Sequence, residues 1–359
     1  MKLEQLNELQ MPTWHWLHMN ETNLDIDADL SAPYKGEVTV ANGEQILVNL
    51  NAKDKSPQNL PADMERIRAF VHQHKNVALT LTIPKGVQLD EPVVIDFVLD
   101  KNSPSLLDYI QVKGEESSRA DIVITYRNGD GGSYFHGGFA SVETKEGANI
   151  RLIKTQLLGK EDVHVDTTAL VVDPHSNGNA IICELGGKNL VSSGNLLLTG
   201  HESKGVFDCL YLGEGNGRQD FNYRLELRGK ESEGEIVVKG ALADSARKVL
   251  KSTLDFISGA AGAKGREEET VLSLSDRVIN LSAPLLLCGE ENVIGEHATT
   301  SGKPDAHKLY YLMSRGFSEK EATRLLVEAS FTPILNKIPS ETLRESVLSR
   351  VQEVVHGDA

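Results

Sequence analysis

Cysteine is scarce in this sequence, with three residues among 359. Cys183, Cys209 and Cys288 lie far apart, and the chain contains no Cys-x-x-Cys pair. This spacing excludes a zinc knuckle or a self-contained iron–sulfur motif, because both take several thiolate ligands from short segments. We therefore expect three free, buried thiols in a reducing compartment.

Positive charge and aromatic residues are also in short supply. Lys and Arg number 37 against 52 Asp and Glu, which gives a formal net charge of −15. A surface of this sign repels nucleic-acid phosphates and anionic membranes. The aromatic share of 5% is too small to supply stacking platforms for single-stranded nucleic acid. The composition therefore argues against nucleic acid and against membranes as partners.

Long apolar runs are missing as well. No uninterrupted stretch approaches the roughly 20 residues that are needed to span a bilayer. The start of the chain, Met1–Glu8, is polar and acidic, and it lacks the basic and apolar regions of a signal peptide. We expect a soluble, cytoplasmic protein.

The common catalytic motifs are absent: there is no Gly-x-Gly-x-x-Gly loop, P-loop lysine motif, His-Glu-x-x-His or Gly-x-Ser-x-Gly. Gly259–Gly265 lacks the Ser/Thr and the helix of a phosphate cradle, so we interpret it as a flexible loop. The acidic run Glu267–Glu269 is interpreted as a solvated face. Four scattered histidines are interpreted as surface or hydrogen-bonded core residues rather than ligands: His136, His164, His175 and His201.

From Val77 onward the sequence contains a long series of short β-type segments. In 77–83, valine, leucine and isoleucine occupy every second position, which is the period of a strand with one buried face. Similar segments recur at 93–99, 122–126, 150–153, 169–172, 181–185, 195–198, 206–212 and 221–227. So many strands without a long helix between them exclude a doubly wound α/β sheet. A sandwich, a closed barrel and a parallel β-helix all stay open.

The N-terminal part is mixed. Short strands are expected at Val38–Val40 and Gln45–Val48, and a helix is expected to open at Pro61. Trp14 and Trp16 are expected to anchor the N-terminal segment onto the body of the protein.

After Pro304 the pattern becomes helical. Leu309, Leu312 and Met313 form one apolar stripe, and Ser318–Glu321 has the form of a capping box that opens a second helix. A third helix is expected after Pro339. Helices of this length are marginal alone, so they must pack on the β body, on a partner, or on both.

A histidine stands where the two patterns meet. His297 lies in a run of small polar residues, and a neutral imidazole suits divalent iron. Its second ring nitrogen needs a hydrogen-bond acceptor, for which Glu296 is a candidate. One histidine cannot hold a metal alone, so a partner chain or neighbouring strands must complete the ligand set.

The same junction carries a family resemblance. His297–Asp305, followed by Leu309–Gly316, resembles the C-terminal signature of the SufB/SufD family of iron–sulfur cluster assembly proteins. The resemblance is specific over about residues 221–332 and loose before that. Two positions depart from the family pattern: Gly295 stands where some relatives have a cysteine, and Ala298 stands where glycine is usual.

The resemblance implies a mainly β fold, an irregular right-handed parallel β-helix with an N-terminal mixed region and a C-terminal helical domain. The corresponding boundaries are 1–75 for the N-terminal region, 76–302 for the β-helix core and 303–359 for the helical domain. It also implies a non-catalytic subunit of an ATPase-driven complex in the SUF system. No cofactor is expected to bind the lone chain tightly, transient iron or an iron–sulfur cluster is expected in the complex, and flavin use is left open.

The partners implied are a SufB-like paralogue, paired through the β-helix, and a SufC-like ABC ATPase, bound by the C-terminal helices. By analogy, His297 faces the paralogue as a candidate iron or cluster ligand. We expect the ATPase to contact apolar positions of the helices, whose alternative role is packing on the chain's own β body: Leu309, Tyr310, Met313, Leu325, Leu326 and Phe331.

Within the family the sequence resembles SufD more than SufB, because no interface cysteine is present near Leu281–Pro284. Two alternatives stay open. One is a SufB-like scaffold that assembles clusters as a homodimer, and self-pairing of the isolated chain would fit it. The other, disfavoured by the acidic charge, is a β-helix enzyme acting on polysaccharide.

Overall fold

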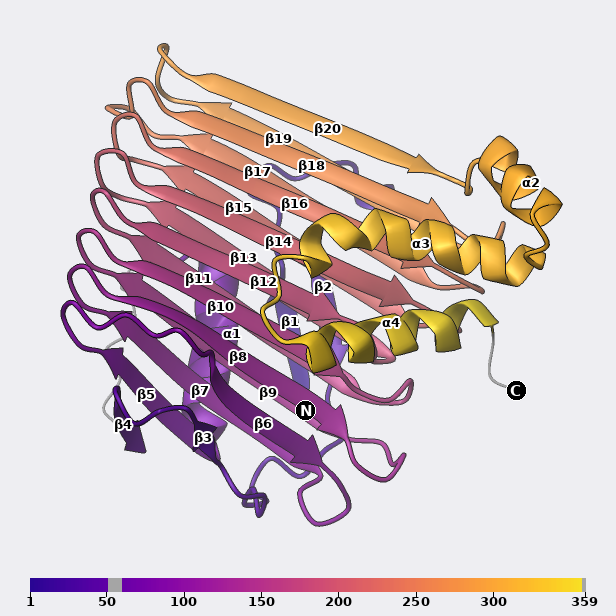
Figure 1. The fold of residues 1–359 in the computed structure, drawn as a ribbon, viewed down its shortest axis with the longest axis horizontal. Coiled ribbons are helices and arrows are strands. Elements are labelled where there is room, and N and C mark those ends of the chain that lie inside the picture. The colour runs from indigo at the N-terminus through magenta and orange to yellow at the C-terminus, as the bar shows by residue number, and fades with distance from the viewer. Residues whose placement is uncertain (51–59, 357–359) are drawn as a thin grey trace.

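A computed structural model describes residues 1–50 and 60–356 of the chain. Two long sheets face each other and form a parallel β-solenoid of about eight turns, and helices cover its outer faces (Figure 1). The predicted parallel β-helix is therefore confirmed, and the sandwich and the barrel are excluded. No helix among the described residues is long and apolar enough to cross a bilayer.

We call the two sheets the front sheet and the back sheet. The front sheet contains β3 (Val40–Ala41), β6 (Val93–Leu99), β8 (Arg119–Asn128), β10 (Asn149–Leu157), β12 (Asn177–Glu184), β14 (Lys204–Gly213), β16 (Glu233–Leu242), β18 (Lys264–Ser273) and β20 (Ile294–Gly302). The back sheet contains β4 (Leu47–Leu50), β5 (Val77–Ile83), β7 (Ser105–Gly114), β9 (Phe135–Thr144), β11 (Val163–Val172), β13 (Asn189–Leu198), β15 (Arg218–Leu227), β17 (Arg247–Phe256) and β19 (Ile279–Cys288).

Each turn of the solenoid adds one strand to each sheet. Strands two apart in the sequence pair in parallel, as β10 does with β12, where Leu152 lies opposite Ala180. Alternate side chains point between the sheets or outward, because successive residues of a strand face opposite sides. In β10, Leu152 belongs to the core between the sheets, whereas Ile153 packs outward against the C-terminal helices.

The two ends of the solenoid differ. At the N-terminal end, β3 pairs with β6 and β4 pairs with β5, both antiparallel, so these short strands finish the two sheets. At the C-terminal end, β19 pairs only with β17 and β20 only with β18 within the described residues. We call β19 and β20 together the open end.

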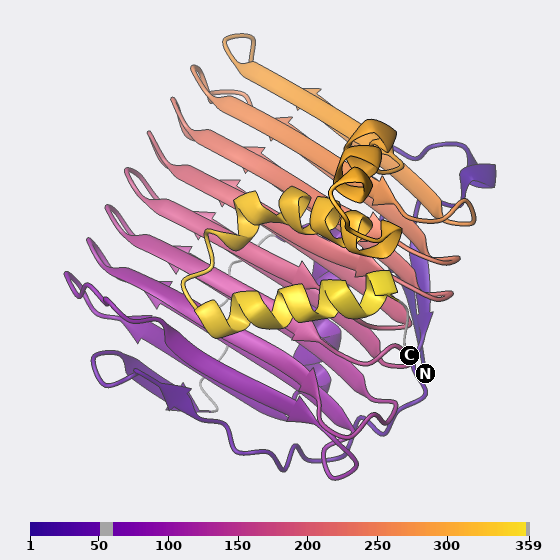
Figure 2. The ribbon, with the colours of Figure 1, turned by 45° about the vertical axis from the view of Figure 1, so that its right-hand side comes forward.

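Elements outside the solenoid cover the two sheets. The back sheet is covered by α1 (Ala62–His74), β1 (Lys2–Leu6) and β2 (Thr22–Asp25). The front sheet is covered by α3 (Glu319–Leu335) and α4 (Glu341–His356), which lie across its strands (Figure 2). A shorter helix, α2 (Ala306–Ser314), connects β20 to α3. The expected helices are confirmed, and Ser318 and Glu321 form the predicted capping box.

The predicted role of the two tryptophans is wrong. Trp14 precedes the short helix η1 (His15–Leu17), Trp16 lies within it, and the two side chains are 73% and 71% exposed. The N-terminal segment is instead held by smaller apolar side chains, since Leu9 and Met19 pack with Val249 of the back sheet.

Candidate functional site

The open end presents two uncovered strands. Every residue of β20 is exposed, and no residue of β19 is more than half-buried. The outer edges of these strands therefore carry backbone N–H and C=O groups that no further coil satisfies within the described chain. On the inward side the two strands touch each other, because the Asn280 side-chain amide donates to Ser301 Oγ at 2.8 Å.

His297 lies near the middle of β20. Its register partner in β18 is Glu267, so the two side chains point to the same, inward face of the front sheet. Glu296 is the next residue in the strand and therefore points outward, where it lines a surface groove with Arg266. The carboxylate beside His297 is thus Glu267, and the proposed pairing of His297 with Glu296 does not fit this geometry.

The acidic run in β18 is not a solvated face, contrary to the sequence interpretation. Glu267 and Glu269 are 2% and 1% exposed and point between the sheets, and only Glu268 faces outward. Lys248, fully buried in β17, forms an ion pair with Glu269 and donates to Ser282 Oγ at 2.9 Å. The interpretation failed because the compensating lysine comes from a strand of the opposite sheet.

Glu267 forms no such ion pair within the described residues. Its Oε2 atom is buried and makes no hydrogen bond among the described residues. Burial, followed by the charge of Glu269, raises the pKa of Glu267 to about 7. A carboxyl group that is half protonated near neutral pH therefore lies directly beneath His297.

The C-terminal helices divide into a covered and an uncovered part. Phe331 is fully buried in the cluster that joins α3 and α4 to the front sheet, so it packs on the chain's own β body. Leu325 and Leu326 of α3 and Leu309 of α2 are half-buried. By contrast, Tyr310 and Met313 of α2 are 75% and 45% exposed.

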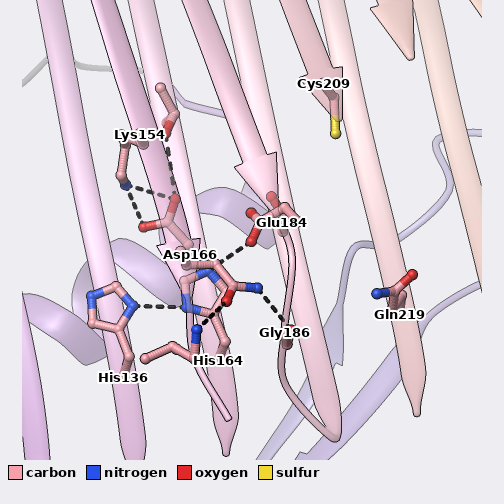
Figure 3. A network of polar contacts seen from close by, with 12 residues as sticks. His136, Lys154, His164, Asp166, Glu184, Gly186, Cys209 and Gln219 are labelled. Carbon is pink, nitrogen blue, oxygen red and sulfur yellow. Dashed lines mark hydrogen bonds and ion pairs between the residues drawn. The ribbon is translucent and has the colours of Figure 1, made fainter. Parts of the chain in front are cut away.

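A polar network that the sequence did not predict lies inside the solenoid (Figure 3). The Nε2 atom of His136 lies 2.6 Å from Asp108 Oδ1, and its Nδ1 lies 2.8 Å from Nδ1 of His164. His164 Nε2 in turn lies 3.3 Å from Oε2 of Glu184. All four side chains are at most 2% exposed and come from β7, β9, β11 and β12.

A buried ion pair adjoins this row. Lys154 of β10 donates to both carboxylate oxygens of Asp166 in β11, at 2.6 and 2.7 Å (Figure 3). Burial lowers the pKa of His136. At His164 burial acts in the same direction, but the carboxylates of Glu184 and Asp166 outweigh it and raise the pKa. His136 and His164 are hydrogen-bonded core residues, as expected, but they belong to one ionisable cluster.

The spacing of the coils explains why the sequence did not predict this cluster. Non-glycine and glycine residues with positive φ mark the same turn of successive coils, at Ser117, Gly147, His175, Glu202, Glu231 and Gly262. These positions are separated by 27 to 31 residues. Because the coil length varies, no fixed repeat shows which residues of neighbouring coils lie side by side.

The cysteines follow the expectation only in part. All three are free, and Cys183 and Cys209 are buried. Burial raises the pKa of Cys183 to about 12 and that of Cys209 well above its usual value, so neither is a ready thiolate. Cys288 is exposed at the end of β19, where no further coil of the described chain covers it. The expectation of a buried thiol was therefore wrong for Cys288.

Comparisons with known proteins agree with this geometry. The family model described as "SUF system FeS cluster assembly, SufBD core domain" matches residues 97–330, from β6 through the open end and α2 into α3. The chain belongs to the SufBD family. The predicted membership in the SufB/SufD family is thus confirmed.

Individual relatives carry the same family description. The iron–sulfur cluster assembly protein SufD of Bacillus subtilis is 27% identical over 312 residues, which cover 79% of this chain and 68% of that protein. A SufBD family protein of Staphylococcus saprophyticus is 23% identical over 265 residues, and one of Staphylococcus haemolyticus is 24% identical over 267 residues. This chain spans 56% of the length of each staphylococcal relative.

Proposed function

We propose that this chain is a non-catalytic scaffold subunit in SUF iron–sulfur cluster assembly. It pairs with a SufB-type paralogue through the open end and binds a SufC-type ABC ATPase through its C-terminal helices. One observation carries the proposal: the family match extends across the open end and α2, and both are uncovered in this chain.

The open end supports pairing because uncovered strand edges are templates for strand addition. A partner strand on β19 or β20 would satisfy the backbone groups of the outer edges. Large apolar side chains are also exposed here, including Ile279 at 44% and Ile294 at 55%. A second solenoid of the same family would cover the strand edges and the exposed apolar side chains together.

Iron is the cargo of this assembly, and His297 is the residue of the open end that best suits it. The imidazole of His297 and the carboxylate of Glu267 share the inward face, and nitrogen with oxygen ligands suits divalent iron. Two ligands do not complete an iron site. The remaining ligands would come from the partner, which agrees with a site shared between two subunits.

The helix α2 supports ATPase docking. None of its residues is buried, and Tyr310, Tyr311 and Met313 are all more than 40% exposed. Aromatic residues and methionine are enriched in protein interfaces. The docking surface proposed here is therefore α2 with the half-buried Leu309, whereas Phe331 holds α3 on the solenoid.

The test is co-expression with the SufB-type and SufC-type proteins of the same genome, followed by native mass spectrometry. We expect a complex that contains all three chains. A Tyr310→Ala/Met313→Ala variant should lose the ATPase and keep the paralogue. The matched control is Leu47→Ala/Leu50→Ala, which removes two side chains that are 60% and 61% exposed on β4, at the opposite end of the solenoid, and should keep both partners.

Two outcomes would overturn the proposal. One is a chain that binds neither partner although it is folded. The other is a chain that forms only a homodimer through the open end and assembles a cluster alone, because this would make it a SufB-like homodimeric scaffold. Reconstitution of the isolated chain with iron and sulfide, with and without His297→Ala, identifies the second outcome.

A further inference from the structure

The interior network has a hydrogen-bonding direction that can be followed atom by atom. Asp108 is a carboxylate acceptor, so His136 donates to it from Nε2. A neutral His136 then has an acceptor at Nδ1, and His164 must donate its Nδ1–H across the 2.8 Å contact. A neutral His164 is consequently left with a lone pair on Nε2.

That lone pair faces another lone pair. His164 Nε2 and Glu184 Oε2 are 3.3 Å apart, and this Oε2 atom makes no hydrogen bond among the residues described. Glu184 is only 1% exposed, so water does not solvate the atom. Two buried acceptors that face each other require a positive centre between them, because an unpaired buried carboxylate oxygen is costly.

The charge balance of the cluster indicates how much positive charge that centre carries. Asp108, Asp166 and Glu184 contribute three carboxylates, and Lys154 contributes one ammonium group. With both histidines neutral, two negative charges are left over. A proton on His164 removes one of them, whereas a divalent cation removes both.

The spacing also suits a metal. Oxygen or nitrogen atoms about 2.0–2.1 Å from one ion at a tetrahedral angle lie ~3.3 Å apart. His164 Nε2 and Glu184 Oε2 are separated by this distance. One ligand atom each from His164, Asp166 and Glu184 lie within 4.8 Å of one another. Asp108 holds His136, and His136 fixes the tautomer of His164, which is the arrangement that orients metal-bound histidines.

We propose that His164, Glu184 and Asp166 form a binding site for a divalent first-row transition-metal ion inside the solenoid. The ion replaces a proton between His164 and Glu184 and coordinates one oxygen of Asp166, while Lys154 keeps the other. One imidazole with two carboxylates is a ligand set that suits iron, manganese or zinc. The site is separate from His297, which lies on the last strand, and it does not depend on the proposed partners.

The test uses Co²⁺ as a spectroscopic probe of the full chain. Because the site is enclosed, Co²⁺ is supplied during expression and again by prolonged incubation of the purified protein. We expect one Co²⁺ per chain with a visible d–d spectrum. Glu184→Gln removes the charge but keeps the shape, and it should weaken Co²⁺ binding by at least ~10-fold.

Two control variants separate this site from other candidates. Glu202→Gln alters the exposed group His201, Glu202 and Glu231, whose ligand atoms also lie within 4.8 Å of one another. His297→Ala alters the open end. Both variants should bind Co²⁺ in the interior as the unaltered chain does, and circular dichroism confirms that each variant is folded.

Anomalous diffraction from Co²⁺-loaded crystals of the unaltered chain keeps the proposal testable if Glu184→Gln does not fold. A peak between His164 and Glu184 supports the site. The proposal is overturned if Co²⁺ is absent after both loading procedures, if it lies only at Glu202 or His297, or if folded Glu184→Gln binds it undiminished.

Discussion

Polar residues lie on the inward faces of the two sheets both in the middle of the solenoid and near its open end. Their hydrogen bonding and burial differ between the two regions. In the middle, Lys154 and Asp166 are covered by coils on both sides and pair with each other. Beside the open end, Glu267 of β18 has one buried oxygen, Oε2, that makes no hydrogen bond in the described chain, and His297 of β20 is exposed. Polar residues in the middle are therefore satisfied by neighbouring strands, whereas the residues of the open end face no further coil within the described chain.

The largest expected effect is in the middle. Lys154→Met leaves Asp166 buried and unpaired, and loss of one partner from a buried pair costs about 3–5 kcal/mol. Urea denaturation should show this loss in the free energy of unfolding. The control is Lys85→Met, which breaks an exposed pair with Glu116 and should change stability very little. Equal losses of stability in the two variants would contradict the claim that the buried pair contributes more than the exposed one.

A smaller, pH-dependent effect is expected at Glu267 of β18, beside the open end. The ordinary pKa of a glutamate is 4.5, and the pKa of Glu267 in the folded chain is about 7. Between these two pH values the folded chain holds the proton of Glu267 more tightly than the unfolded chain does. The free energy of unfolding therefore falls as pH rises through this window. Glu267→Gln removes the charge that faces Glu269, so the variant should gain about 1–3 kcal/mol over the unaltered chain at pH 8.

The same comparison at pH 4.5 should show little difference between Glu267→Gln and the unaltered chain, because both are then neutral at this position. Glu268→Gln is the matched control, since its side chain points outward one residue along the strand. If Glu268→Gln has the same pH-dependent effect, Glu267 is not the group responsible.

The smallest expected effect leaves stability unchanged and concerns the thiols. Cys288 at the open end is exposed, whereas Cys183 and Cys209 are buried. A thiol reagent should therefore label one cysteine rapidly in the native chain and all three after denaturation. Mass spectrometry of the labelled peptides identifies the reactive residue. Rapid native labelling of Cys209 would show that the interior is more open than the structure indicates.

Local patterns predicted much of the fold. The alternation in 77–83 predicted β5, and the Ser318–Glu321 capping box predicted the start of α3, because both depend on residues close in sequence. The choice of a parallel β-helix over a sandwich came from the family resemblance and not from periodicity. Varying coil lengths of 27 to 31 residues conceal the repeat.

The site was predicted less well, because it depends on contacts between coils. His297 was located at the end of the β region, but its carboxylate neighbour is Glu267 on the preceding front strand and not Glu296 beside it. The three consecutive glutamates in β18 looked solvated until the fold brought Lys248 next to Glu269. His164 likewise has partners from other strands, which the sequence alone does not bring together.

The most direct test of the central claim is hydrogen–deuterium exchange of the chain alone and in complex with the SufB-type paralogue. If the open end is the pairing surface, peptides covering Ile294–Gly302 should exchange rapidly in the free chain and be strongly protected in the complex. Peptides covering β3 and β4 at the other end should not change. A complex in which Ile294–Gly302 exchanges as fast as in the free chain would contradict the claim.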